Sequence, residues 1–169
     1  IRDVVQASEG HMYDQPELAR QKIIEALGYV LLDGRCPRQY SLPVNGAPGR
    51  ADLREFIDQG AWVVSTLYTY IALTGDTALL NERLGYHRLV DTGIAPAEGQ
   101  DGTVLDHLIR IMGFLGRNRA PETGLLRALY GDWNDAVDGL GMTNEPGESF
   151  GSGVSVMASL QFYQNCREM

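Results

Sequence analysis

Apolar side chains recur every three to four residues in several stretches of the chain, a spacing that is typical of amphipathic helices. In the first such stretch the shared face is formed by Ala19, Ile23, Ala26, Leu27 and Val30. Asp14, a common capping residue, and Pro16, which suits a first helical turn, precede this face, and Gly34 follows it. We therefore predict a helix that begins after Asp14 and ends before Gly34.

Three further stretches have the same character. Residues 52–74 are apolar around so much of the helical circumference that we expect a largely buried helix, followed by a short helix over residues 76–84. Thr103 is placed to cap a third long helix, and a last helix is expected to begin near Gly153.

The segments between these helices are rich in glycine and proline. No segment of useful length alternates between apolar and polar residues, which is the pattern of a half-buried strand. We therefore predict an all-α fold of stacked helical hairpins, with irregular loops over residues 35–50 and 89–102 and after Asn118. Long loops in compact domains are often functional, so we expect a site where these loops gather.

Composition narrows the range of partners. The chain has 169 residues, of which 44% are hydrophobic, enough for one globular unit. Fourteen Lys and Arg against 22 Asp and Glu give a net charge of −8, and no basic run is present, so neither nucleic acid nor a membrane surface is expected as a partner. No stretch approaches the roughly 18 apolar residues of a membrane-spanning helix.

Cysteine and histidine residues do not form metal-binding patterns. Cys36 and Cys166 lie far apart, and none of the three histidines has a second ligand at metal-binding spacing, so we expect no metal site and a cytoplasmic protein. The chain begins with Ile1, and its last stretch, SVMASLQFYQNCREM, stops while a helical pattern is still running. These ends lead us to expect a segment of a longer polypeptide.

The stretch GDWNDAVDG, residues 131–139, concentrates three carboxylates and a tryptophan. Asp132 and Asp135 are three residues apart, and neighbouring carboxylates resist joint ionisation, which leaves a proton available for donation. Trp133 offers a flat apolar wall for the C–H face of a sugar, and Asn134 can both donate and accept hydrogen bonds. The alternative is structural, because Asp, Asn and Gly are common in turns and caps and a tryptophan can anchor a core.

Several motifs, in their order along the chain, carry a resemblance to a known family. They are IRDVVQ, LREFIDQGAWVVSTLYTYIALTGDTALLNE, GTVLDHLIRIMGFL and LYGDWNDAVDGLG, of which the DWND tetrad is the most specific. Together they resemble glycoside hydrolase family 94, the cellobiose-phosphorylase family of inverting glycoside phosphorylases. The resemblance covers nearly the whole chain. It implies helical hairpins forming about half of an (α/α)6 barrel, with residues 1–169 as part of a single catalytic domain.

The resemblance also implies roles for individual residues. The last Asp of DWND is the general acid of the family, which corresponds to Asp135, and the Trp of that motif lines the sugar site, which corresponds to Trp133. Asp132 is then a neighbour that orients or tunes the acid. Arg2 and Asp3, from the RD-x-x-Q stretch, correspond to residues that contact the sugar whose bond is broken.

Asp58 stands where the family often has the first of two acids ahead of a tryptophan, here Trp62. Three departures from the family pattern matter. Ala7 replaces an acid after RD-x-x-Q, Gln59 replaces the second of the paired acids, and the family's G-E-S-V appears as GVSV at residues 153–156. These departures favour a substrate other than cellobiose, and the sequence looks most like the branch that acts on β-1,2-linked glucans.

The activity implied by the resemblance is inverting phosphorolysis, a glycosyl transfer to phosphate. Inorganic phosphate, as co-substrate and with no other cofactor, attacks the anomeric carbon of a β-linked gluco-oligosaccharide while Asp135 protonates the leaving oxygen, giving α-glucose 1-phosphate. One alternative is an inverting hydrolase with Asp132, Asp138 or Glu148 as base, and another is a non-catalytic carbohydrate-binding or assembly module. A partial barrel would expose apolar helix faces, so we expect contact with the rest of its polypeptide or formation of a homo-oligomer.

Overall fold

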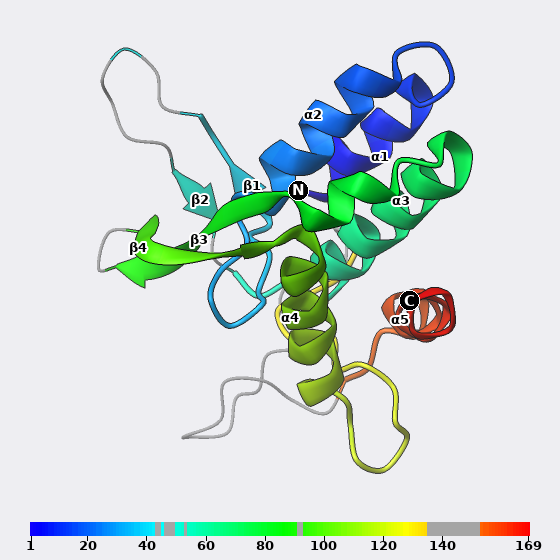
Figure 1. Cartoon of the computed structure of the whole chain (residues 1–169). Coiled ribbons are helices and arrows are strands. Elements are labelled where there is room, and N and C mark those ends of the chain that lie inside the picture. The colour runs from blue at the N-terminus through cyan, green and yellow to red at the C-terminus, as the bar shows by residue number, and fades with distance from the viewer. Residues whose placement is uncertain (43–44, 46–49, 53, 91–92, 135–152) are drawn as a thin grey trace.

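The computed structural model describes residues 1–42, 45, 50–52, 54–90, 93–134 and 153–169. In chain order its elements are the helices α1 (Arg2–His11) and α2 (Pro16–Leu27), the short strands β1 (Gln39–Tyr40) and β2 (Ala51–Asp52), helix α3 (Asp58–Thr74), the 3-10 turn η1 (Thr77–Asn81), the strands β3 (Arg83–Val90) and β4 (Gly93–Thr103), and the helices α4 (Val104–Arg117) and α5 (Val156–Glu168). Figure 1 shows α1, α2 and α3 packed together, with the β3–β4 hairpin projecting away from them.

Helix α3 is the central element of the core. It packs against α1, α2, α4 and α5, and its first ten residues from Asp58 to Leu67 are almost all buried, as the predicted buried helix requires. The helix begins at Asp58 instead of residue 52, because Ala51 and Asp52 pair with β1. It ends at Gly75, whose φ of 73° is readily adopted only by glycine, and Asp76 then caps η1 by accepting a bond from the Leu79 N–H.

Helix α1 does not follow from the apolar pattern, because few of its residues are apolar. Val5 and Ser8 are the buried residues of this helix, and the Ser8 hydroxyl is satisfied by donating to the Val5 carbonyl at 2.6 Å. Glu9 accepts a bond from Thr66 of α3 at 2.8 Å. The helix therefore depends on neighbours that are distant in the sequence.

The prediction of an all-α fold is wrong. Residues 83–103, for which we predict the end of a short helix and an irregular loop, instead form the antiparallel β3–β4 hairpin, and β1 pairs with β2 inside the predicted loop of residues 35–50. Most hairpin side chains are half-buried or exposed, so a core-facing alternation is absent. Pro96 and the glycines of β4 are tolerated because both strands of a two-stranded sheet are edges.

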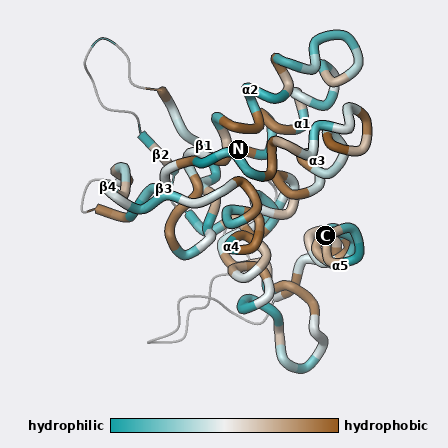
Figure 2. The backbone as a smooth tube through the Cα atoms, in the orientation of Figure 1, coloured by the Kyte–Doolittle hydropathy of each residue, from teal (hydrophilic) through white to brown (hydrophobic). Residues whose placement is uncertain are grey.

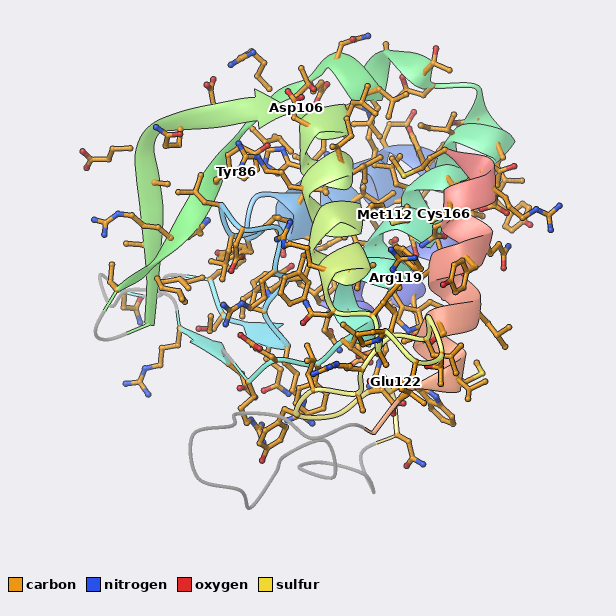
Figure 3. All side chains as sticks on the ribbon, turned by 90° about the horizontal axis from the view of Figure 1, so that it is seen from below. Tyr86, Asp106, Met112, Arg119, Glu122 and Cys166 are labelled. Carbon is orange, nitrogen blue, oxygen red and sulfur yellow. The ribbon has the colours of Figure 1, made fainter. Side chains whose placement is uncertain are left out.

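Contacts with the helices hold the hairpin in place. The Tyr86 ring stacks on the His107 ring of α4 with centroids 3.9 Å apart, and the His87 N–H donates to the Val30 carbonyl at 2.9 Å. Figure 3 shows Tyr86 on the hairpin beside α4, which begins near the labelled Asp106. The shift in register between Gly85 and His87 also breaks the alternation that a regular hairpin would display.

Local signals placed the starts of α4 and α5 well. Thr103 caps α4 in a capping box, since its hydroxyl accepts from the Asp106 N–H at 3.1 Å while Asp106 accepts from the Thr103 N–H at 2.8 Å. Along α4 the hydrophobic and hydrophilic residues lie on different sides of the helix (Figure 2). Ser155 caps α5, two residues beyond the predicted start near Gly153. In contrast, α2 has Gln15 at its N-cap, so Asp14 does not cap it.

Candidate active site

A pocket of about 410 Å³ lies where four distant parts of the chain meet. It is lined by Arg2, Asp3, Gln6, Trp62, Trp133 and Met157. Three of these residues, Arg2, Asp3 and Trp133, are ones that the sequence indicates as sugar contacts. The structure therefore brings the RD-x-x-Q stretch and the tryptophan of DWND to one site.

Backbone pairing explains why the DWND motif reaches this site. The Tyr130 N–H donates to the Glu55 carbonyl at 2.9 Å, and the Ile57 N–H donates to the Gly131 carbonyl at 3.1 Å. These bonds hold the segment before the motif against the residues that lead into α3. Trp133 therefore lines one pocket with Trp62 of α3, and 47% of its surface remains exposed.

Asp132 holds the turn that carries Trp133. One carboxylate oxygen accepts the Asn134 N–H at 3.0 Å, and the other accepts the Ser155 hydroxyl at 2.7 Å. The second bond ties the turn to the start of α5, the helix that carries Met157. Asp132 thus makes the bonds of a turn residue, and it directly precedes Trp133 in the pocket lining.

Arg2 is the cation of the pocket lining. Its Nη1 donates to Asp58 at 3.3 Å and its Nε donates to the exposed Asp3 at 3.2 Å. Burial lowers the pKa of Arg2, but the charges of Asp58 and Asp3 outweigh this effect and its pKa lies above the ordinary value. Arg2 therefore stays charged and can donate to sugar hydroxyls.

Asp58 does not line the pocket. Only 1% of its surface is exposed, and its carboxylate accepts bonds from Arg2 and from the Gln59 amide. Burial raises the pKa of Asp58, and the Arg2 charge opposes that rise. Asp58 is therefore connected to the pocket through its bond to Arg2, which is a lining residue. Asp135, to which the family resemblance gives the role of general acid, lies outside the described residues, as do Asp138 and Glu148.

Three lining residues carry no assigned role in the sequence analysis. Gln6 belongs to the RD-x-x-Q stretch and Trp62 follows Asp58 in the family pattern, so motif position could have identified both. Met157 had no such signal, because a methionine on an amphipathic helix reads as an ordinary packing residue. Two indole rings and a thioether form apolar walls, while Arg2, Asp3 and Gln6 supply polar groups.

The described residues contain neither a metal-binding cluster nor a membrane-spanning helix. Within the described ranges, no three side chains of His, Cys, Asp or Glu are grouped so that they could hold a metal ion. Two histidines bond backbone carbonyls, His87 to Gly28 at 2.6 Å and His107 to Thr103 at 2.8 Å. In the same part of the chain, no helix has the length and apolar character required to cross a bilayer.

Comparison with known proteins shows the family of the chain. The sequence profile described as glycosyl hydrolase 94 superfamily, catalytic domain, matches residues 1–169. The chain is similar to solabiose phosphorylase of Paenibacillus borealis, with 32% identity over 153 residues, which is 90% of this chain and 16% of that protein. It is also similar to the cyclic β-(1,2)-glucan synthase NdvB of Rhizobium meliloti (strain 1021), with 28% identity over 86% of this chain and 5% of the synthase.

A third relative is the N,N'-diacetylchitobiose phosphorylase of Vibrio furnissii, with 28% identity over 48% of this chain and 9% of that enzyme. The chain thus spans less than a fifth of the length of each of these relatives. Because the family profile covers every residue of the sequence, the chain belongs to the glycosyl hydrolase 94 superfamily and represents part of its catalytic domain.

Proposed function

We propose that the protein carrying this chain is an inverting glycoside phosphorylase, which cleaves a β-linked gluco-oligosaccharide with inorganic phosphate and releases α-glucose 1-phosphate. The observation that carries this proposal is the pocket that is lined by Arg2, Asp3 and Gln6 together with the indole rings of Trp62 and Trp133. Indole rings suit the C–H faces of a pyranose, and a few placed polar groups suit its hydroxyls. Family membership gives this pocket its chemical context.

The roles within this mechanism are proposed as follows. Asp135 donates a proton to the leaving oxygen while phosphate attacks the anomeric carbon from the opposite face. Trp133 packs against the sugar ring, Arg2 and Asp3 bind its hydroxyls, and Asp132 orients the segment that carries the acid. An inverting hydrolase needs a second carboxylate to activate water, whereas phosphate is itself the nucleophile and needs only the acid. No cofactor beyond the phosphate co-substrate is required.

For the substrate, we propose a β-1,2-linked glucan or oligosaccharide. The similarity to a cyclic β-(1,2)-glucan synthase supports this linkage, as does the departure of Ala7 and Gln59 from the family pattern. The named phosphorylases among the relatives support phosphorolysis as the reaction. We also propose a cytoplasmic location, which accords with the free thiols of Cys36 and Cys166.

A paired assay tests the reaction type. The complete protein, incubated with β-1,2-linked glucose oligosaccharides, should release α-glucose 1-phosphate only when inorganic phosphate is present. In the reverse direction, glucose 1-phosphate should extend glucose or a short oligosaccharide, and the linkage of the product names the substrate. Sugar release that is independent of phosphate would identify a hydrolase, and binding without turnover would identify a carbohydrate-binding module.

We also propose that the apolar surface between α3 and α4 packs against another part of the same polypeptide. A groove of about 220 Å³ is lined there by residues that include Tyr68, Ile71 and Leu105. Tyr68 and Leu105 are each 42% exposed, although both are large apolar residues. Contiguous exposed apolar surface of this kind marks an interaction site.

Sedimentation velocity measurements test this packing. The 169-residue chain on its own should associate with itself as its concentration rises, because the groove would otherwise remain in contact with water. The substitution Leu105→Gln should weaken the association, whereas the complete protein should not show it. A chain that remains monomeric over the whole concentration range would contradict the proposal.

A further inference from the structure

Three hydrogen bonds close a ring between the start of α1 and the start of α3. The backbone N–H of Arg2 donates to Gln59 Oε1 at 3.0 Å, and the Gln59 Nε2 donates to Asp58 Oδ1 at 3.0 Å. Asp58 Oδ2 accepts the third bond, from Arg2 Nη1, at 3.3 Å. We refer to these three residues as the Arg2–Asp58–Gln59 ring.

The ring is buried at one end and open to the pocket at the other. Asp58 and Gln59 are only 1% and 2% exposed, whereas the Arg2 side chain is 17% exposed and lines the pocket. Gln59 itself is not among the lining residues, so it acts on the pocket only through its two neighbours in the ring. The next residue, Gly60, lies so close to α4 that an added Cβ would be 2.6 Å from the Ile111 side chain, which leaves this turn little room to move.

An amide is the group that this position requires. Gln59 must accept a bond from a backbone N–H and donate one to a carboxylate, and a primary amide can do both. An ionised carboxylate at the same position could accept but not donate, and it would place a second negative charge beside Asp58. Methionine would fill a similar volume without making either bond.

We propose that Gln59 is a positioning residue that fixes the guanidinium of Arg2 at the pocket wall, holding its backbone directly and its side chain through Asp58. This inference rests on the proposed function, in which Arg2 binds the hydroxyls of the glucose unit whose bond is broken. Arg2 makes this contact in both the ground state and the transition state. Loss of its placement therefore raises KM more than it lowers kcat.

The test measures phosphorolysis of a β-1,2-linked glucose oligosaccharide by the complete protein with Gln59→Glu and Gln59→Met, at about pH 5 and about pH 8, which lie near and well above the ordinary glutamate pKa. In Gln59→Glu the introduced carboxyl group, while protonated, can replace the amide donor. It loses that ability as the pH rises. KM should therefore rise with pH relative to the wild type, reaching roughly tenfold to a hundredfold at the higher pH, the range expected when a hydrogen bond to a charged group is lost.

In Gln59→Met both bonds are lost at every pH, so KM should be raised equally at both pH values. Gln21→Glu, an exposed glutamine on α2, is the matched control and should retain wild-type kinetics. A wild-type KM in Gln59→Met, or a KM in Gln59→Glu that does not change with pH relative to the wild type, would overturn the proposal.

A second readout separates this proposal from the proposed function. The melting temperature of Gln59→Glu should fall below that of the wild type as the pH rises, because two carboxylates then face each other inside the protein. If the wild type forms no glucose 1-phosphate, the proposed reaction fails while this temperature difference still reports on the ring. A difference that stays constant with pH would show that the ring does not form.

Discussion

Replacing Asp135 with asparagine should lower kcat for phosphorolysis of an oligosaccharide by about 10²–10⁴-fold, the usual contribution of a general acid. An amide of the same shape cannot deliver a proton to the departing sugar oxygen, whereas substrate binding by Trp133 and Arg2 should be retained. KM should therefore change little. The measurement is the steady-state rate of glucose 1-phosphate formation by the complete protein.

Two controls make this result specific to proton donation. Asp138→Asn, in the same acidic segment, should retain near-wild-type activity, because phosphorolysis needs no second carboxylate as a base. An aryl β-glucoside with a nitrophenolate leaving group needs little proton assistance, so Asp135→Asn should lose far less activity on this substrate. An unchanged kcat on the oligosaccharide would show that Asp135 is not the acid and would favour the non-catalytic module.

Arg2→Met should destabilise the folded protein by about 3–5 kcal/mol, the cost of leaving one partner of a buried ion pair alone. Asp58 would keep its buried position but lose the Arg2 charge, which opposes the effect of burial on its pKa. Its pKa in the folded state, already raised, should rise further above that of the unfolded chain. Stability is then retained at low pH and lost as the pH increases through the folded-state pKa.

Thermal unfolding of the complete protein at acidic and at mildly alkaline pH measures this effect. Arg2→Met should show the larger drop in melting temperature at the alkaline pH, and adding Asp58→Asn should recover much of it because no buried charge remains. Arg83→Met is the matched control. Arg83 pairs with Asp101 at 2.7 Å, but both side chains are more than half exposed, so its loss should have little effect on stability at either pH. Equal effects of the two substitutions would contradict a special role for the Arg2–Asp58 pair.

Local patterns were sufficient for the long helices. The apolar stripe and the Thr103 capping box define α4 from residues within one or two turns of each other, and the nearly continuous apolar surface of α3 indicates the burial that its first ten residues show. Such signals act over three or four residues and are therefore readable along the chain. The exact start of α3 could not be predicted, because Ala51 and Asp52 form a strand that pairs with residues 39 and 40.

Elements with weak local signals were missed for a common reason. Helix α1 has little apolar surface and depends on α2 and α3, and the β3–β4 hairpin buries few side chains while it depends on Val30 and His107. In both cases some of the stabilising partners are distant in the sequence: Thr66 bonds α1, and Val30 bonds the hairpin. A period of 2.0 or 3.6 residues appears only where one face of an element is turned toward the core.

The order of the motifs along the chain was enough to indicate the family and to select Arg2, Asp3 and Trp133 as members of one site. It could not indicate that Met157 also lines the pocket or that Asp58 is buried and bonded to Arg2. Nor could it indicate that Gln59 links Asp58 to the backbone of Arg2. Residue type and spacing specify which chemical groups are available. Whether a given group can contact a sugar or instead supports another residue depends on its burial and on its hydrogen bonds. The bonds of Arg2 to Asp58 and to Gln59 join positions that are 56 and 57 residues apart in the sequence, so they exist only after the chain has folded.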